Sequence, residues 1–234
     1  WDAGVPADND VVVIAAGHVV EFDVDQSGFA NGIDGLTITG QLSLTRTAGT
    51  YYLKMKNGKN INGAGIFDCG TAISPIPFTS KHTFGGPSWY VKGDDGTGMT
   101  MSVYGAEPAI KSVQLTTAAA IGATILNVDT DVTGDIWRVG DTVYVCNINK
   151  GKNVEKFTIS NISPTTITLN SGLVSAKLEG SHIVLATRNI RFLVAGNHCM
   201  QSFGGFRLTI AGGEFVGHSS YYTVHNSSVK VYGG

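Results

Sequence analysis

Charged residues are scarce in this chain. Only 15% of its 234 residues are Asp, Glu, Lys or Arg, and the formal net charge is −2. Because neither sign is in excess and no basic run occurs, the sequence lacks the charge pattern that nucleic acid or an anionic membrane surface attracts. The 42% of hydrophobic residues, together with this low charge, also exclude an intrinsically disordered chain.

Long apolar runs and paired cysteines are lacking as well. No stretch approaches the roughly 20 apolar residues of a transmembrane helix, so we expect no membrane insertion. Cys69, Cys146 and Cys199 lie far apart, whereas metal sites use close pairs such as C-x-x-C. We therefore expect no metal and no cofactor. Free thiols buried as small apolar groups are the favoured interpretation, and one disulfide with a third thiol left over is the alternative.

Glycine, in contrast, is abundant, with 31 residues. In the stretch 10–44 it separates short runs of apolar and β-branched residues, namely Val11–Ile14, Val19–Val24, Leu36–Ile38 and Leu42–Leu44. Such runs favour β-strands, and glycine allows the tight corners between them. Short strands joined by tight corners are typical of a solenoid, in which stacked parallel coils bury one another's apolar faces.

The chain changes character twice along its length. Residues 1–109 and 188–234 carry the coil pattern, whereas 110–187 contain short strands at regular intervals with turns between them. That spacing predicts a small antiparallel β-barrel or sandwich inserted into the solenoid, with Trp137 buried and a turn at Gly140–Asp141. The expected fold class is therefore all-β. In the coils, seven apolar side chains should point inward: Ile38, Leu44, Ile190, Phe192, Leu208, Ile210 and Val231.

Residues spread along most of the chain follow the pattern of a known family. Those near the start are Trp1, Pro6, Asp10–Ile14, Gly17, Val19–Val20, Asp23, Leu36–Ile38 and Gly40–Leu42. Those further along are Val103–Gly105, Trp137–Asp141, Glu155, Thr166–Leu169, His182, Thr187–Ile190 and Gly213–Phe215. With these residues the sequence resembles the eight-glycine extracellular domain of fibrocystin and the cell-migration-inducing hyaluronidases. The resemblance implies a right-handed parallel β-helix, extracellular placement and contact with polysaccharide.

Hyaluronan cleavage is not implied by this resemblance. Tyr104 stands where family members often carry a histidine, and the histidine-rich segment of the family is reduced here to His218 and His225. These two histidines could meet Glu214 if they lie on neighbouring coils. Ordinary surface histidines are the simpler interpretation, and the catalytic residues stay unassigned.

Carboxylates are the first candidates for a site, because glycoside hydrolysis commonly uses two of them. Asp23 and Asp25 alternate along what we expect to be one strand, which would place them on one face. They could form an acid/base pair or bind a cation, or they could belong to an exposed polar face of a coil.

Aromatic residues are the stronger functional candidates. Trp89 and Tyr90 follow a glycine-rich turn, and Tyr221 and Tyr222 lie between two expected strands. Exposed aromatic rings stack on the apolar faces of sugars while their polar edges satisfy hydroxyl groups. We therefore assign these four residues as candidate glycan-binding residues. The alternative is that they fill the core or a corner.

The sequence as a whole favours a non-catalytic, extracellular β-helical module of a longer surface, fibre or phage tail or spike protein. Its expected partners are a polysaccharide or other glycan and the neighbouring domains of the same parent chain, and a homo-oligomer is left open. One alternative is a polysaccharide hydrolase or lyase of hyaluronidase-like character. Another is a purely structural fibre spacer. Two acidic residues converging in a groove would favour the enzyme.

Overall fold

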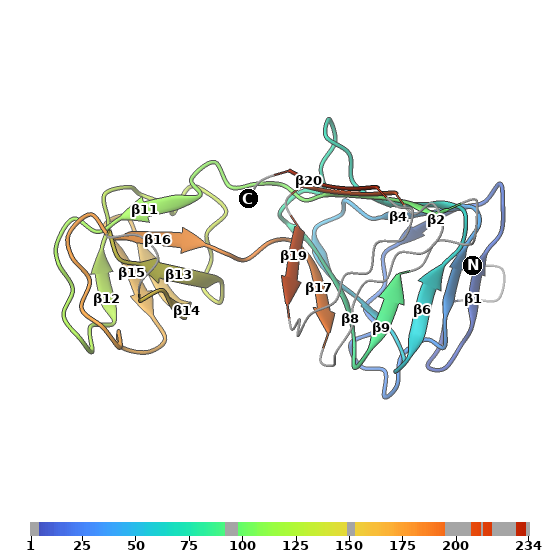
Figure 1. Ribbon diagram of the computed structural model, residues 1–234, viewed down its shortest axis with the longest axis horizontal. Coiled ribbons are helices and arrows are strands. Elements are labelled where there is room, and N and C mark those ends of the chain that lie inside the picture. Colours follow the sequence, from blue (N-terminus) through green and yellow to red (C-terminus); the bar gives the residue numbers. More distant parts are fainter. Residues whose placement is uncertain are drawn as a thin grey trace. The chain divides into compact units, whose positions relative to one another are not determined.

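The computed structural model describes residues 5–91, 98–148, 153–194, 207–211, 213–216 and 228–232, with the backbone alone described at 90, 194, 207, 208, 210, 214–216 and 228–232. Every regular element in these ranges is a β-strand (Figure 1), so the all-β fold class is confirmed. The chain divides into two compact units, one made of Trp1–Ala106 with Arg188–Gly234 and the other of Glu107–Thr187. We call them the coil unit and the barrel unit.

The coil unit is built from three sheets whose strand pairs are all parallel. Sheet one contains β1 (Val12–Ile14), β3 (Leu36–Ile38), β6 (Lys59–Asn62) and β9 (Trp89–Val91) in that order. Sheet two contains, in order, β2 (Val19–Phe22), β4 (Gln41–Leu44), β7 (Ile66–Cys69), β10 (Thr100–Tyr104), β18 (Arg207–Ala211) and β20 (Ser228–Tyr232). Sheet three contains β5 (Gly49–Lys54), β8 (Ser80–Gly86), β17 (Ile190–Val194) and β19 (Gly213–Val216).

The chain visits these sheets in rotation. β3, β4 and β5 form one pass, and β6, β7 and β8 form the next, each strand lying in register beside its counterpart. Figure 1 shows the same stacking later in the chain, where β17 lies between β8 and β19. Residues that alternate inward along the strands therefore stack on one another from pass to pass.

That stacking makes the core of the coil unit. Ile38, Leu44, Ile190 and Phe192 are all buried, as the sequence predicted. The side chains of Leu208, Ile210 and Val231 lie outside the described residues, so their predicted orientation stays a prediction.

Glycines at the corner between sheets one and two let the passes approach closely. A Cβ atom on Gly40 would lie 2.3 Å from the carbonyl oxygens of both Ala15 and His18. A Cβ atom on Gly65 would lie 2.1 Å from the carbonyl oxygen of Gly40 in the pass before it. Because these neighbours are backbone atoms that cannot rotate away, only glycine fits at the two positions.

The corner between sheets two and three grows longer from one pass to the next. β2 ends at Phe22 and the chain reaches sheet three at Asp25, whose backbone bridges to Tyr52. The following corner spans 45–48, and the one after it spans 70–79. In the fourth pass this corner contains the whole barrel unit, between β10 and β17.

The barrel unit is a six-stranded antiparallel sheet. In sheet order its strands are β11 (Ser112–Gln114), β16 (His182–Leu185), β13 (Thr142–Cys146), β14 (Glu155–Ser163), β15 (Thr166–Leu169) and β12 (Ile125–Asn127). Beyond the ends of β11 and β12, Leu115 and Val128 form an antiparallel bridge. Because this bridge joins the two edge strands, the sheet closes on itself.

Two further sequence predictions concern this unit, and both are confirmed. Trp137 is only 1% exposed, and its indole N–H donates a hydrogen bond to the Ile110 carbonyl oxygen at 2.8 Å. Gly140 has φ +93°, and the Asp141 N–H donates to the Arg138 carbonyl oxygen at 3.1 Å, which makes the turn into β13.

Candidate functional site

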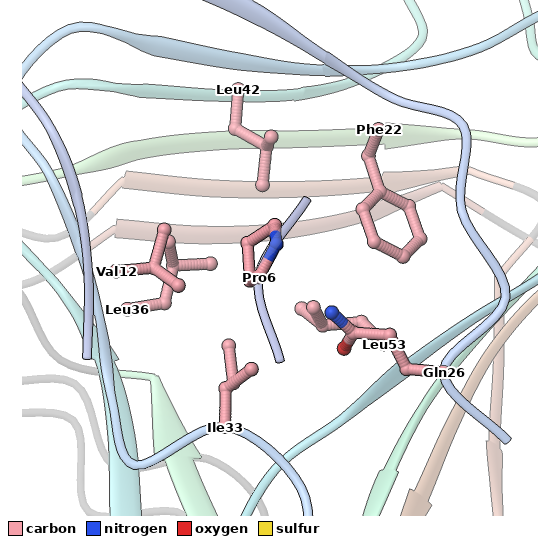
Figure 2. A pocket seen from close by; sticks show the side chains of 8 residues that line it. All are labelled: Pro6, Val12, Phe22, Gln26, Ile33, Leu36, Leu42 and Leu53. Atoms are coloured by element: carbon pink, nitrogen blue, oxygen red, sulfur yellow. The ribbon is translucent and has the colours of Figure 1, made fainter. Parts of the chain in front are cut away.

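An apolar pocket inside the first pass of the coil unit offers no ligand site. Its eight lining residues (Figure 2) are Pro6, Val12, Phe22, Gln26, Ile33, Leu36, Leu42 and Leu53. Pro6 projects among the others, and the space that remains is about 10 Å³. That volume is about the least that can hold a single water molecule. Pro6 therefore closes the end of the apolar core.

An open polar groove of about 450 Å³ lies on the outside of the coil unit. It is lined by Glu21 of β2, by Ser43 and Leu44 of β4, and by Arg46 and Thr47 of the corner after β4. Glu21 and Ser43 are register partners in neighbouring parallel strands, and neither is buried, which places both side chains on the outer face. We call this surface the corner groove.

The polar groups of the corner groove include both donors and acceptors. Glu21 presents an exposed carboxylate that forms no ion pair with any described residue. The Ser43 hydroxyl accepts a hydrogen bond from Gln41 Nε2 at 2.8 Å and keeps its own proton to donate. Arg46 donates from Nη2 to the Ser74 carbonyl oxygen at 2.9 Å, and a guanidinium has further N–H groups to offer. The arrangement can therefore bind a ligand that carries several hydroxyl groups.

The outer face of sheet two extends this polar surface. Ser43 is in register with Asp68, and Asp68 is in register with Ser102. Glu21 and Asp68 are two strands apart, so their Cα atoms are separated by about 9.6 Å at the usual strand spacing. Asp68 does not line the groove, and its Oδ1 accepts from the Gly70 N–H at 2.8 Å. The corner groove therefore contains one carboxylate.

Trp89 is not a glycan-binding residue, which corrects the sequence prediction. The structure shows it fully buried, and its indole N–H donates to the Leu193 carbonyl oxygen at 2.9 Å. Its ring centroid lies 6.3 Å from that of Phe192 in the core. Strand alternation explains the result, because Trp89 and Val91 both point inward from β9. The side chain of Tyr90 lies outside the described residues, as do Tyr221 and Tyr222 in full.

The predicted pair of Asp23 and Asp25 does not lie on one strand, because β2 already ends at Phe22. Both carboxylates are exposed, and Asp25 Oδ1 accepts from the Ser27 N–H at 2.9 Å. The alternation that was expected to align them does not extend past the strand. The histidine candidates His218 and His225 lie outside the described residues, and Glu214 is described only by its backbone in β19.

Tyr52 is an outward-facing aromatic residue that the sequence analysis missed. It lies on β5 between the inward positions Tyr51 and Leu53. The hydroxyl end of its ring lies over Gly85 of the neighbouring strand β8, because a Cβ atom on Gly85 would lie 2.0 Å from Tyr52 Oη and 2.7 Å from Cζ. The alternation of β5 could have predicted that Tyr52 faces outward. Nothing local could have predicted that a glycine lies beneath it.

The coil unit also buries a histidine that is not open to a ligand. His82 is fully buried, with Nε2 at 2.8 Å from Ser80 Oγ and 2.9 Å from the Thr45 carbonyl oxygen. Burial lowers the pKa of His82 to about 4, although the hydrogen bond to Thr45 acts in the opposite direction. The ring is therefore neutral at physiological pH and is a structural part of the core.

The barrel unit buries a lysine instead. The Lys177 side chain is fully enclosed, and its Nζ lies 2.8 Å from Glu155 Oε1 and 3.1 Å from Ser175 Oγ. Burial opposes ionisation of Glu155, yet hydrogen bonds from Lys177, Ser175 and the Val174 N–H lower the pKa of Glu155 to about 2. The two side chains form a structural ion pair that links the start of β14 to the segment before β16.

Three further observations concern metal sites, thiols and membrane-spanning helices. Among the described residues, no three His, Cys, Asp or Glu side chains gather into a group that could hold a metal ion. Cys69 and Cys146 are free thiols. Burial raises the pKa of the Cys69 thiol, and the negative charge of the neighbouring Asp68 raises it further. The described part of the chain also contains no helix that could span a membrane.

Comparison with known proteins gives two structural likenesses. No family model and no curated protein matches the sequence. The tailspike gp61 of Pseudomonas phage phi297 aligns with a TM-score of 0.32 and 13% identity, over 68% of this chain and 28% of the tailspike. The Gp54 tailspike of Acinetobacter baumannii bacteriophage AP22, solved in complex with A. baumannii capsular saccharide, aligns with a TM-score of 0.31 and 13% identity, over 79% of this chain and 30% of the tailspike.

This chain therefore spans less than a third of the length of either tailspike. At these TM-scores the likenesses carry no argument about function.

Proposed function

We propose that this chain is a non-catalytic module that binds polysaccharide through the corner groove. The coil unit would be a right-handed parallel β-helix belonging to a longer extracellular surface, fibre or phage tail or spike protein. Three sheets of parallel strands visited in rotation support the solenoid. Kinship with the eight-glycine extracellular domain is part of the same proposal, and it rests on the residues that resemble that family.

The observation that carries the binding function is the lining of the corner groove. Glu21 accepts, Arg46 donates and Ser43 can do either, which matches the mixed donors and acceptors of sugar hydroxyl groups. These groups extend from paired strands and an adjoining corner, so little backbone order has to be gained on binding. The outward row that continues to Asp68 and Ser102 would let a glycan chain extend along sheet two.

The same lining favours binding over cleavage. Hydrolysis of a glycosidic bond usually requires a general acid together with a second carboxylate facing the scissile bond. Glu21 is the only carboxylate among the residues that line the groove. Ser43 lies between it and Asp68 in the register of sheet two.

Binding can be tested with a panel of bacterial capsular, O-antigen and animal polysaccharides, using calorimetry on the whole chain. A hydrogen bond to a charged group contributes about 1.5–3 kcal/mol, so Arg46→Ala and Glu21→Gln should each weaken binding by about tenfold or more. Glu179→Gln is the matched control, because this exposed glutamate belongs to the barrel unit. Unchanged affinity in both groove variants would refute the groove as the site. Release of new reducing ends that stops in Glu21→Gln would refute the non-catalytic assignment.

A further inference from the structure

We infer that Tyr52 and Gly85 form a stacking platform for a pyranose ring on the outer face of sheet three. The inference rests on the proposed function and adds a second subsite to it. The ligand class is a sugar whose ring presents an apolar C–H face. The corner groove contains no aromatic residue, so the two surfaces would recognise different features of a glycan.

The register of β5 and β8 creates the platform. Tyr52 pairs with Thr83, and Lys54 pairs with Gly85, which makes Gly85 the diagonal neighbour of Tyr52 on the outer face. Because Gly85 has no side chain, the hydroxyl end of the tyrosine ring can lie over the bare backbone, as the distances of 2.0 Å and 2.7 Å from a hypothetical Cβ to Oη and Cζ show. Tyr52 is only partly buried, so part of its ring is open to a ligand.

The Tyr52 hydroxyl is available to a ligand. It forms no hydrogen bond with any described residue, in contrast to the Tyr51 hydroxyl, which donates to the Thr47 carbonyl oxygen at 3.2 Å. Burial raises the pKa of Tyr52, so the phenol keeps its proton at physiological pH. The ring can therefore stack on the C–H face of a sugar while its hydroxyl group bonds to a neighbouring sugar hydroxyl.

Polar residues lie near Tyr52 in the register of the same sheet face. Asp25, whose backbone bridges to Tyr52, presents an exposed carboxylate from the preceding pass. Thr83 lies beside Tyr52, and Lys81 is the exposed residue two positions before Thr83. No described residue forms an ion pair with Lys81. An aromatic ring bordered by an acceptor and donors is a typical sugar-binding arrangement, since sugars are apolar on the ring faces and polar at the edges.

The experiment observes Tyr52 directly in the full chain labelled with ring-¹³C tyrosine. The Tyr52 signal is identified by its absence in Tyr52→Phe, and methyl pyranosides of several sugar types are titrated to high millimolar concentration. We expect a saturable shift of the Tyr52 signal and none for Tyr144, a 38% exposed tyrosine of the barrel unit that serves as the internal control. Gly85→Ala should abolish the shift, because the new methyl group displaces the ring. A Tyr52 signal that responds no more than that of Tyr144 would overturn the inference.

Polysaccharide affinity then separates this inference from the proposed function. Tyr52→Ala should weaken binding about three- to tenfold, as expected for one stacked ring, while Tyr52→Phe should retain most of the affinity. Normal affinity in Tyr52→Ala, with a loss in Arg46→Ala, would overturn the platform and leave the corner groove intact. A shift of Tyr52 by methyl pyranosides without polysaccharide binding would support the platform and refute the proposed function.

Discussion

The coil unit buries a histidine, His82, and the barrel unit buries a lysine, Lys177, and the two groups avoid an isolated buried charge in opposite ways. His82 in the coil unit has no charged partner among the residues that the structure describes and stays neutral, with a depressed pKa of about 4. Lys177 in the barrel unit contacts the Glu155 carboxylate, whose own pKa falls to about 2. A buried site can avoid the cost of an isolated charge by neutralising the group or by pairing it.

The difference in charge between His82 and Lys177 follows from the hydrogen-bond acceptors that surround each side chain. In the coil unit, His82 meets the Thr45 carbonyl oxygen of the preceding pass, 37 residues earlier in the sequence. Its other ring nitrogen, Nδ1, finds no acceptor among the described residues, so a second proton there would lack a partner. In the barrel unit, the Lys177 ammonium group contacts the Glu155 carboxylate, the Ser175 hydroxyl and the Asn153 carbonyl oxygen. The lysine therefore has enough acceptors to keep its charge.

The largest expected effect tests whether the two units are independent. Phe84 is fully buried, stacked on Phe192 with ring centroids 5.0 Å apart and set edge-on to Phe67 at 5.3 Å. Phe84→Ala should destabilise the coil unit by about 3–5 kcal/mol through lost burial and a cavity. Hydrogen exchange in urea, followed separately for β8 and β13, measures the effect on each unit.

The matched variant is Phe157→Ala, which removes a buried phenylalanine from the barrel unit. It should accelerate exchange in β13 and leave β8 unchanged, the reverse of Phe84→Ala. If either variant accelerates exchange equally in both strands, the chain unfolds as one cooperative unit and the comparison between two units fails.

A second prediction sharpens the contrast by breaking the ion pair. Glu155→Ala leaves the enclosed Lys177 charge without its carboxylate, so the barrel unit should lose about 3 kcal/mol. The double variant Glu155→Ala/Lys177→Met also removes the charge and should therefore be more stable than Glu155→Ala alone. Urea unfolding monitored by exchange in β13 measures both. A double variant less stable than the single one would show that Lys177 contributes through packing and not through its charge.

The inward-facing residues of the coil unit could be predicted from local sequence, whereas the residues that they meet in neighbouring passes could not. The alternation along each strand correctly placed Ile38 and Phe192 inside. Applied to β8, the same alternation places Ser80, His82 and Phe84 on one buried face, so the burial of His82 was within reach of the sequence. Which residues meet there depends on the register between passes, which a single sequence does not encode locally.

The candidate site shows the same limit. Trp89 was selected because a loop-rich neighbourhood suggested exposure, but it begins a strand and points into the core. Tyr52 was overlooked because its role depends on Gly85, 33 positions away in sequence and in the adjacent strand. The corner groove was also missed, since Glu21 and Arg46 come together only when two passes stack.

The smallest expected effect is a difference in acid sensitivity between the two units. The folded pKa of His82, about 4, lies below its ordinary value of 6.5, so the unfolded chain binds the additional proton first as the pH falls. The coil unit should therefore lose stability between pH 6.5 and 4, with about 2 kcal/mol lost from pH 7.5 to 5. The depressed pKa of Glu155 affects the stability of the barrel unit only at lower pH. Its contribution is fully present above pH 4.5 and is lost as the pH falls through about 2.

Urea unfolding at pH 7.5, 6.5, 5.5 and 5.0, followed by exchange in β8 and β13, measures this difference. His82→Gln keeps an N–H donor for the Thr45 carbonyl oxygen but cannot bind a proton in this range, so it should remove most of the pH dependence in β8. His18→Gln is the control, because His18 is exposed in the same unit and its replacement should leave the pH dependence unchanged. An equal dependence in wild type and His82→Gln would show that the histidine is not the acid-sensitive group. Any greater acid sensitivity of the coil unit would then have another cause.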